Sequence, residues 1–259
     1  MSAIRAAAKS LFAAADIVRR SPPGPRVLIY HQVGTNHGHQ MEVTLDDFQR
    51  QIDWLNAERE VVDLDTAVAR WSGPGADRLA VLTFDDGYSD VFTTAFPILE
   101  DRGMPFVLYV STSLIADDAA SGEDALSWSD LEKMLASGLM TLGAHTHSHP
   151  DLRSLRDEEV EEELSTSDDV LHRRLGLRPR HFAYPYGFWS ESADASVRLR
   201  YDTAVLGGSP RPDVAPDPHL LHRYPVQLSD RFTFFKRRMS GGFWLEETLR
   251  RRLKGYAGP

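Results

Sequence analysis

The 259-residue chain contains no cysteine, which excludes several classes of site. A disulfide scaffold, a thiol nucleophile, a cysteine-ligated zinc ion and an iron–sulfur cluster all require that residue. Any metal ion must therefore be held by histidine and carboxylate side chains. The chain also lacks an excess of positive charge, because 29 Lys and Arg stand against 38 Asp and Glu, a net charge of −9. We therefore expect no nucleic-acid partner, since phosphate-backbone binding relies on clustered basic side chains.

Long hydrophobic runs are absent as well. No stretch approaches the roughly 18 apolar residues of a membrane-spanning helix. Near the start, the uncharged run between Lys9 and Asp16 is shorter than the ~7 to 15 apolar residues of a secretory signal, so we expect a cytoplasmic location. Residues 1–25 instead predict an amphipathic helix and a Pro-rich linker. That helix either packs on the rest of the protein or makes a membrane-surface or dimer contact.

From residue 26 onward, short apolar runs alternate with longer helical patterns, which is typical of β–α units and a mainly parallel sheet. Seven runs predict strands: 27–31, 61–64, 79–84, 106–110, 140–145, 181–185 and 202–206. Between the strands, Thr44 is expected to cap one helix, and Ser129 with Glu132 to form the capping box of another. A third helix is predicted over 157–175, with its acidic side exposed to solvent.

Two neighbouring carboxylates, Asp85 and Asp86, directly follow the strand predicted at 79–84. Adjacent side chains on a strand point to opposite faces, so both can serve one site only where the strand ends and turns. Gly87 allows such a turn. The carboxyl ends of parallel strands form the functional face of α/β barrels, where two carboxylates can divide the roles of metal ligand and base. The ordinary alternative is a pair of aspartates that cap a helix.

Three histidines, His145, His147 and His149, end the strand predicted at 140–145 and follow it. Neutral imidazole is the commonest metal ligand, so this spacing favours a metal site over a loop of unliganded surface histidines. His145 and His149 would lie on one side of a helical turn, whereas His145 and His147 would share one face of a strand. We favour the first pair as ligands and His147 as part of the loop structure.

Together, these two motifs resemble the polysaccharide deacetylase family, the NodB-homology carbohydrate esterases. The first family motif, Thr-Phe-Asp-Asp-Gly, stands intact at 83–87, and the second is present from His145 to His149. The likeness extends over roughly residues 26–226. It implies an α/β fold, a single distorted (β/α)7 barrel, which we place at 26–228. The remaining 229–259 are expected to form a basic C-terminal helical segment.

The resemblance also implies roles for the motif residues. Asp86, His145 and His149 would hold one divalent metal, and Asp85 would act as the base. Zinc is the expected ion, and the same ligands also suit cobalt, nickel or iron.

A third motif, Phe-Ala-Tyr-Pro-Tyr-Gly at 182–187, aligns with the family but carries Ala183 where many members have an arginine that orients the base. This form is similar to the branch that acts on poly-N-acetylglucosamine-type exopolysaccharides, and the chain also resembles the small holdfast-type deacetylases. By the same likeness, the backbone N–H of Tyr186 faces the developing oxyanion. We take Arg223, on a later strand, as the replacement for the missing guanidinium.

The general acid is predicted from the start of the barrel. The family usually places a Leu-x-His near the C-terminus, where the histidine protonates the leaving amine, and no good match follows residue 226. In the exopolysaccharide branch the equivalent strand is circularly permuted to the front, and 27–31 resembles it. His31 is therefore the expected general acid, with a buried, hydrogen-bonded histidine as the alternative.

Aromatic side chains near these motifs suit stacking on a pyranose ring, although large aromatics more often belong to a core. We expect substrate contacts from Tyr88, Trp128, Tyr184 and Trp189, with Tyr186 and Phe188 as further candidates.

The predicted function is metal-assisted removal of N-acetyl groups from N-acetylglucosamine-type residues of an exopolysaccharide or its lipid-linked precursor. Asp85 would deprotonate a metal-bound water that attacks the acetyl carbonyl, and His31 would protonate the departing nitrogen. Three alternatives stay open. They are hydrolysis of a non-carbohydrate amide or cyclic imide on the same barrel, O-acetyl ester hydrolysis, and a non-catalytic glycan-binding module.

A basic segment near the C-terminus contrasts with the acidic barrel. Residues 231–254 hold eight Lys and Arg and two Glu, together with Phe243 and Trp244. Such a stretch predicts peripheral contact with anionic lipid at the inner membrane face. A terminal helix that neutralises the barrel or makes a homodimer contact is the alternative. The expected partner in either case is an N-acetylated glycan substrate.

Overall fold

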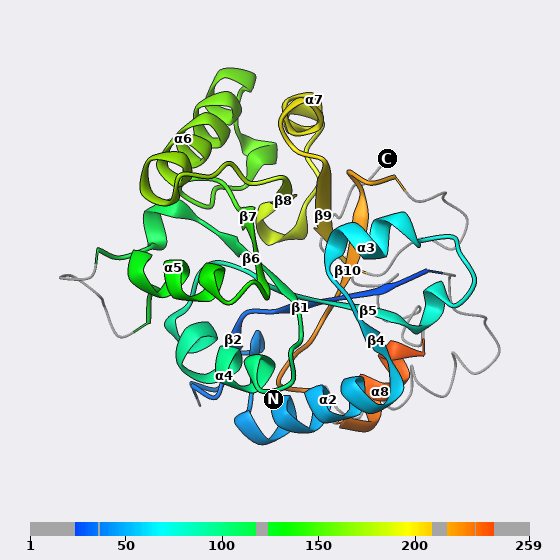
Figure 1. Cartoon of the computed structure of the whole chain (residues 1–259). Helices are drawn as coiled ribbons and strands as arrows, with labels where there is room; N and C mark the ends of the chain where they lie inside the picture. Colours follow the sequence, from blue (N-terminus) through cyan, green and yellow to red (C-terminus); the bar gives the residue numbers. More distant parts are fainter. Residues whose placement is uncertain (1–23, 36, 118–123, 209–216, 231, 241–259) are drawn as a thin grey trace.

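Seven parallel strands close into a barrel in the computed structural model, which describes residues 24–35, 37–117, 124–208, 217–230 and 232–240 (Figure 1). The strands are β1 (Arg26–Tyr30), β5 (Leu79–Phe84), β6 (Phe106–Val110), β7 (Met140–Ala144), β8 (His181–Ala183), β9 (Thr203–Gly207) and β10 (Leu221–Pro225). Each strand pairs with the next in this order, and β1 pairs with both β10 and β5. The predicted (β/α)7 barrel is therefore confirmed.

One predicted barrel strand, 61–64, is wrong. In its place lie a two-residue strand, β4 (Glu60–Val61), paired with β5 outside the ring, and the start of helix α3 (Leu64–Ala69). Asp63 caps α3 by accepting the N–H of Thr66 at 2.7 Å, which ends any extended run. The seventh strand of the ring is β10, whose sequence Leu-His-Arg-Tyr-Pro carries two basic residues and therefore does not show as an apolar run.

Two of the three helix predictions hold, and the third is shifted. Thr44 caps α2 (Leu45–Glu58), and α6 (Asp157–Leu175) has the predicted bounds. Helix α5 (Trp128–Ala136) starts two residues earlier than predicted. Its capping box joins Ser127 to Asp130, so the pairing of Ser129 with Glu132 is wrong.

The remaining elements are β2 (Gln32–Val33), β3 (Glu42–Val43), η2 (Ala76–Arg78), η3 (Val91–Ala95), α4 (Phe96–Glu100), η4 (Thr112–Leu114), η5 (Leu152–Ser154), η6 (Pro185–Gly187), α7 (Glu191–Arg200) and α8 (Phe232–Met239).

The strands bury both of their faces, as parallel sheets require. One set of alternating side chains fills the barrel interior, and the other packs against the surrounding helices. Leu64 and Ala67 of α3 join the interior cluster. Asp65 of the same helix lies 3.8 Å from His181 at the start of β8, so α3 covers the amino ends of the strands. The opposite, carboxyl end is left for the functional site.

Helix α8 packs on the barrel body, beside α2. Phe235 is buried and meets the Trp54 ring edge-on at 5.9 Å, while the buried Arg238 pairs with Asp230 at 3.3 Å. This part of the predicted basic segment is therefore held against the protein, and Arg238 is not available to a lipid surface. Residues 241–259 and the predicted N-terminal helix within 1–23 lie outside the described residues. No helix in the described part of the chain has the length and apolarity that a membrane crossing requires.

Asp90, a buried residue just before η3, should make the stability of the fold depend on pH. Burial raises the pKa of its carboxyl to about 7, and the nearby Glu42 carboxylate adds to this rise. Between about pH 4 and 7 the Asp90 carboxyl is protonated more in the folded chain than in the unfolded one, so its contribution to the free energy of unfolding falls as pH rises. Asp90→Asn should remove this loss and be more stable than wild type above pH 7, by up to about 4 kcal/mol.

Urea denaturation at pH 4, 5.5 and 7.5 measures this difference. Glu132→Gln, on the exposed side of α5, is the control and should follow the wild-type pH dependence. Parallel pH profiles for Asp90→Asn and wild type would show that Asp90 is ionised in the folded protein and contradict the prediction.

Candidate active site

Asp85 and Asp86 lie where β5 ends and the chain turns. Asp86 has a φ of 75° and Gly87 a φ of 104°, both in the left-handed region. A Cβ on Gly87 would come within 2.6 Å of the Ile115 side chain, so only glycine fits this turn. Asp85 can thus point into the barrel while Asp86 points along its carboxyl end. In the described chain neither aspartate caps a helix, since η3 begins only at Val91.

Arg223 of β10 binds Asp85 with both arms of its guanidinium. Its Nη1 and Nη2 donate to the two carboxylate oxygens at 2.6 and 2.7 Å, and both side chains are almost completely buried. Nη1 also donates to the hydroxyl of Thr83 at 2.9 Å, which in turn donates to the Leu28 carbonyl. The structure therefore places a guanidinium from a later strand on Asp85, as the sequence analysis expected in view of Ala183.

Tyr109 and Gly143 support this ion pair and were not identified from the sequence. The Arg223 guanidinium lies 5.2 Å over the Tyr109 ring. A Cβ at position 143 would lie 2.3 Å from an atom of that ring, so Gly143 leaves the room that Tyr109 occupies. A glycine inside a predicted strand is a known sign of such a close approach, and that signal was present.

The ion pair sets the charge of Asp85. Burial raises the pKa of its carboxyl, but the Arg223 guanidinium and His145 outweigh that effect, and the pKa lies below its usual value. Asp85 is therefore ionised at neutral pH. A bidentate contact of this kind offsets the cost of burying two charges.

Asp86, His145 and His149 come together at the carboxyl end of the barrel. Their ligand atoms all lie within 4.8 Å of one another. Asp86 Oδ1 lies 3.5 Å from His145 Nε2 and 3.4 Å from His149 Nε2, and it is buried without a hydrogen bond from any described residue. His145 Nδ1 lies 2.7 Å from the Ala183 carbonyl, which can only accept, so Nδ1 carries a hydrogen and Nε2 is the nitrogen that the neutral ring would offer to a metal ion.

The histidine loop, residues 145–149, reaches this arrangement without the helical turn that the spacing suggested. In the described loop Thr146 and His149 adopt left-handed φ values of 66° and 58°, so the helical expectation is wrong. The two left-handed residues reverse the chain and return His149 to the side of His145. His147 points away from both and is hydrogen-bonded through Nδ1 to the Thr112 hydroxyl at 2.8 Å, consistent with a place in the loop structure.

Glu163 of α6 also contacts this loop. Its Oε2 accepts the N–H groups of His147 and Ser148 at 3.0 and 2.8 Å, and its Oε1 accepts the Ser148 hydroxyl at 2.6 Å. The prediction that the acidic side of this helix is exposed to solvent is therefore wrong for Glu163. Its position directly before the buried Leu164 was the available signal, because it places the carboxylate at the border of the packed face.

His31 lies at the carboxyl end of β1, within the electrostatic reach of the same cluster. Asp85, Asp86, Arg223 and His145 all act on its pKa, and burial lowers it below the usual value for histidine. Its Nδ1 is buried and has no hydrogen-bond partner among the described residues. The alternative of a histidine satisfied by protein hydrogen bonds is therefore not supported for that nitrogen.

Tyr186 lies on the open side of the site. Its side chain is 56% exposed, and its ring centroid is 4.6 Å from that of His149. Tyr186 has a left-handed φ of 59° within η6, a single helical turn. No residue in the described part of the chain accepts the Tyr186 N–H, so this group can serve an external acceptor.

The four residues predicted to contact substrate differ in their burial and in their contacts. Tyr184 is fully buried and packs edge-on against Phe182 at 5.2 Å, so its assignment to substrate is wrong. It alternates with Ala183 along β8 and faces the packed helices. Trp189 donates its Nε1–H to Asp194 at 3.0 Å and packs on the core. Tyr88 is half-buried next to the acidic turn, where burial and the Asp86 charge raise its pKa.

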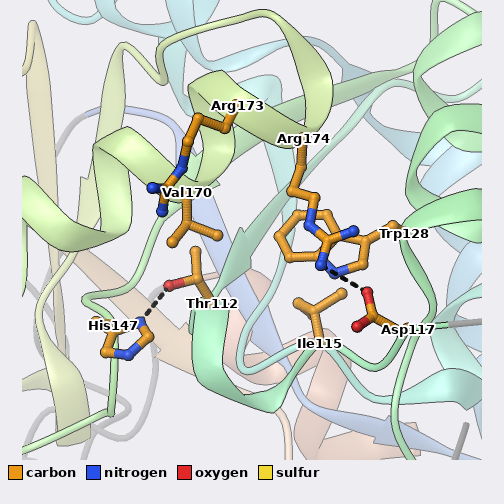
Figure 2. Close-up of a pocket in the computed structure, with 8 residues that line it drawn as sticks. All are labelled: Thr112, Ile115, Asp117, Trp128, His147, Val170, Arg173 and Arg174. Atoms are coloured by element: carbon orange, nitrogen blue, oxygen red, sulfur yellow. Dashed lines mark hydrogen bonds and ion pairs between the residues drawn. The ribbon is translucent and has the colours of Figure 1, made fainter. Parts of the chain in front are cut away.

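Trp128 lines a cavity of about 530 Å³ beside the histidine loop (Figure 2). His147 and Thr112 form one wall, and Arg173 reaches toward them from α6. At the other end the Arg174 guanidinium lies 5.3 Å over the Trp128 ring and pairs with Asp117 at 2.7 Å. The cavity therefore combines an aromatic face with charged hydrogen-bonding groups, and it shares His147 with the loop that carries His145 and His149.

Comparison with known proteins identifies the class to which this barrel and site belong. Residues 72–204 match the model of the polysaccharide deacetylase family, and the chain is a member of that family. The matched span begins after β1 and ends before β10, so His31 and Arg223 lie outside it.

Individual relatives cover more of the barrel. The structure of IcaB from Ammonifex degensii superposes with a TM-score of 0.74 at 25% identity, covering 86% of this chain and all of that one. A Streptococcus pyogenes deacetylase, PplD, shows the same fold at 23% identity, with a TM-score of 0.71 over 85% of this chain and 99% of that one.

Two curated enzymes are similar in sequence. The poly-beta-1,6-N-acetyl-D-glucosamine N-deacetylase of Staphylococcus epidermidis is 26% identical over 60% of this chain and 57% of its own length. The peptidoglycan-N-acetylglucosamine deacetylase of Bacillus cereus is 29% identical over 45% of this chain and 39% of its own length. The chain therefore spans less than two thirds of these relatives.

Removing the guanidinium from Asp85 should cost much of the stability of the fold. Arg223→Met leaves a buried, unpaired carboxylate, and we expect the free energy of unfolding to fall by about 3–5 kcal/mol. In an Asp85→Asn background the same substitution should cost at least about 2 kcal/mol less, because no buried charge is left behind. Urea denaturation of the four proteins gives the coupling.

Arg102→Met is the matched control, because Arg102 pairs with Asp53 at the surface, and it should cost less than about 1 kcal/mol. Additive effects of the Asp85 and Arg223 substitutions would show that the pair does not act as a unit.

Proposed function

We propose that the chain is a metal-dependent enzyme that hydrolyses the N-acetyl amide of N-acetylglucosamine-type residues in an exopolysaccharide or its lipid-linked precursor. The observation that carries this proposal is the juxtaposition of Asp86, His145 and His149 with a second carboxylate, Asp85, fixed by Arg223. The name of the similar poly-beta-1,6-N-acetyl-D-glucosamine N-deacetylase supports the substrate class.

The three converging side chains fit a divalent metal ion. Two imidazole nitrogens and one carboxylate oxygen are a catalytic donor set, because they leave positions open for water and substrate. The buried Asp86 Oδ1, unbonded among the described residues, is the atom that a cation would satisfy. When bound there, the ion would act as a Lewis acid and lower the pKa of a water molecule. Zinc is the default for this set, and cobalt, nickel and iron also suit it.

Asp85 is the proposed base. Arg223 occupies one lone pair on each of its oxygens, which leaves the other lone pairs to accept a proton from the attacking water. The same contact fixes the plane of the carboxylate, so the base cannot turn away from the site. Its low pKa keeps it ionised, and therefore ready to accept, throughout the neutral range.

His31 and Tyr186 complete the proposed reaction. Burial lowers the pKa of the His31 imidazole and favours its uncharged form, so the proton that it delivers to the departing sugar nitrogen is the one that Asp85 takes from the attacking water. The Tyr186 N–H donates to the oxygen of the acetyl carbonyl as that oxygen becomes negative. One preorganised donor of this kind is worth about 3 to 4 kcal/mol in the transition state.

Substitution of the base should separate chemistry from metal binding. Asp85→Asn should lower acetate release from a poly-N-acetylglucosamine oligomer by about 10²–10⁴-fold, because proton abstraction is lost. The bound metal, measured by mass spectrometry, should stay at the wild-type level, because Asp85 is not in the ligand group. Asp86→Asn should lower both quantities.

Asp46→Asn, on the exposed side of α2, is the control and should change neither quantity. An Asp85→Asn protein that releases acetate at the wild-type rate would eliminate Asp85 as the base. A wild-type protein that opens cyclic imides or cleaves O-acetyl esters but leaves the glycan amide intact would replace the proposed substrate.

We further propose that the cavity beside the histidine loop binds a neighbouring sugar of the chain, with Arg173 as the hydrogen-bonding contact. Arg173→Gln should raise the KM for a tetrasaccharide by about 5–10-fold, which corresponds to one lost charge-assisted hydrogen bond. The KM for a monosaccharide should not change, because it does not reach the cavity. Steady-state acetate release on both substrates measures the difference.

Arg178→Gln supplies the matched control, since Arg178 is equally exposed but does not line the cavity. Equal effects of Arg173→Gln on the two substrates would remove the cavity from the binding site.

A further inference from the structure

The histidine loop holds two of the proposed metal ligands in a backbone conformation that is costly by itself. Thr146 and His149 both lie in the left-handed region, with φ values of 66° and 58°. A residue with a Cβ costs about 1–3 kcal/mol there, so such a loop persists only where the surrounding structure holds it. The contacts that hold this loop therefore decide whether His149 stays beside His145.

One side of the loop is held by the segment that follows β6. The Ser111 hydroxyl donates to the His145 carbonyl at 2.8 Å, and the Ser113 N–H donates to the His147 carbonyl at 2.9 Å. These bonds engage carbonyl groups and leave the N–H groups of the loop to other acceptors. Within the loop, the His149 N–H donates to the Thr146 hydroxyl at 3.1 Å.

The other side of the loop is held by Glu163. Its carboxylate accepts the N–H groups of His147 and Ser148 and the Ser148 hydroxyl, at 3.0, 2.8 and 2.6 Å. These two residues lie between the left-handed pair, at the point where the chain reverses. The helix that carries this carboxylate is fixed, because Val160 and Leu164 are fully buried in the core. Helix α6 therefore presents the acceptor to the centre of the turn from a fixed backbone.

We propose that Glu163 is a positioning residue for the metal site. By holding the N–H groups of His147 and Ser148, it keeps the loop in the conformation that brings His149 next to His145 and Asp86. It is not itself a ligand, since its oxygens are engaged and it is outside the described group of metal-ligating atoms. This inference rests on the proposed metal site, and it adds a requirement that lies outside all three family motifs.

Metal binding by the substrate-free protein tests the proposal. Purified full-length apoprotein is titrated with Co²⁺, whose visible absorption reports coordination geometry, and with Zn²⁺ in competition with a chelator. Glu163→Ala should weaken Zn²⁺ binding by about 10–100-fold, the range found for partners that orient metal ligands, and should alter the Co²⁺ spectrum. At saturating metal, acetate release should recover most of its wild-type rate, because the reacting groups are intact.

Two further variants separate hydrogen bonding from simple charge. Glu163→Gln keeps an acceptor for the two N–H groups and an amide that can donate to the Ser148 hydroxyl, so its metal affinity should stay within about 3-fold of wild type. Ser148→Ala removes one of the three bonds from the exposed loop side and should weaken binding by about 3-fold, consistent with one neutral hydrogen bond. Glu162→Ala, at the exposed neighbouring position of α6, is the matched control and should bind like wild type.

The outcomes distinguish this inference from the proposed function. If the wild-type protein binds neither Co²⁺ nor Zn²⁺, both the proposed metal site and the proposed role of Glu163 are wrong. A wild-type protein that binds both ions, together with a Glu163→Ala protein of unchanged affinity and Co²⁺ spectrum, overturns only the positioning role. Equal weakening in Glu163→Gln and Glu163→Ala would assign the effect to the negative charge and likewise overturn it.

Discussion

The buried ion pair between Arg223 and Asp85 is the interaction on which both the barrel and its site depend. It joins the last strand of the ring to the strand that ends in the acidic turn, across an interior packed mainly with apolar side chains. A lone charge at either position would be too costly to bury, so each residue requires the other. The same contact orients the carboxylate that we assign as the base. Stability and chemistry are therefore coupled at one point of the fold.

The sequence was sufficient to predict the class of fold, the acidic turn and the histidine pair, because each leaves a local pattern. What it did not reveal depends on contacts between distant segments. The strand that carries Arg223 contains two basic residues and shows no apolar run, so it was missing from the predicted strands although Arg223 itself was singled out. Glu163 belongs to an acidic run whose other members face solvent, and its contact with the histidine loop follows from helix packing. For Tyr184 the sequence led to a wrong assignment. The residue is close to a motif in sequence, but its side chain is buried in the core and cannot reach a substrate.

The site residues fall into two groups, those inside the span that matches the family model and those outside it. The span that matches the family model contains the acidic turn, the histidine loop and Glu163, whereas His31 and Arg223 come from the two strands outside it. Those two strands, β1 and β10, pair with each other where the ring closes, as the blue and orange strands in Figure 1 show. The groups assigned to proton delivery and to orientation of the base thus enter the site from opposite ends of the chain. The metal-ligating groups all come from its middle.

The distance in sequence between Asp85 and Arg223 has a consequence for how the protein is made. The two residues are 138 positions apart, so the acidic turn leaves the ribosome long before its cationic partner. At about 5–20 residues per second, the interval is roughly 7 to 28 seconds. During that time the nascent chain carries a carboxylate that cannot be buried, and the ring cannot close without β10. Barrel closure is therefore a late event that follows synthesis of nearly the whole domain, and a chain truncated before this strand has neither a closed core nor an oriented base.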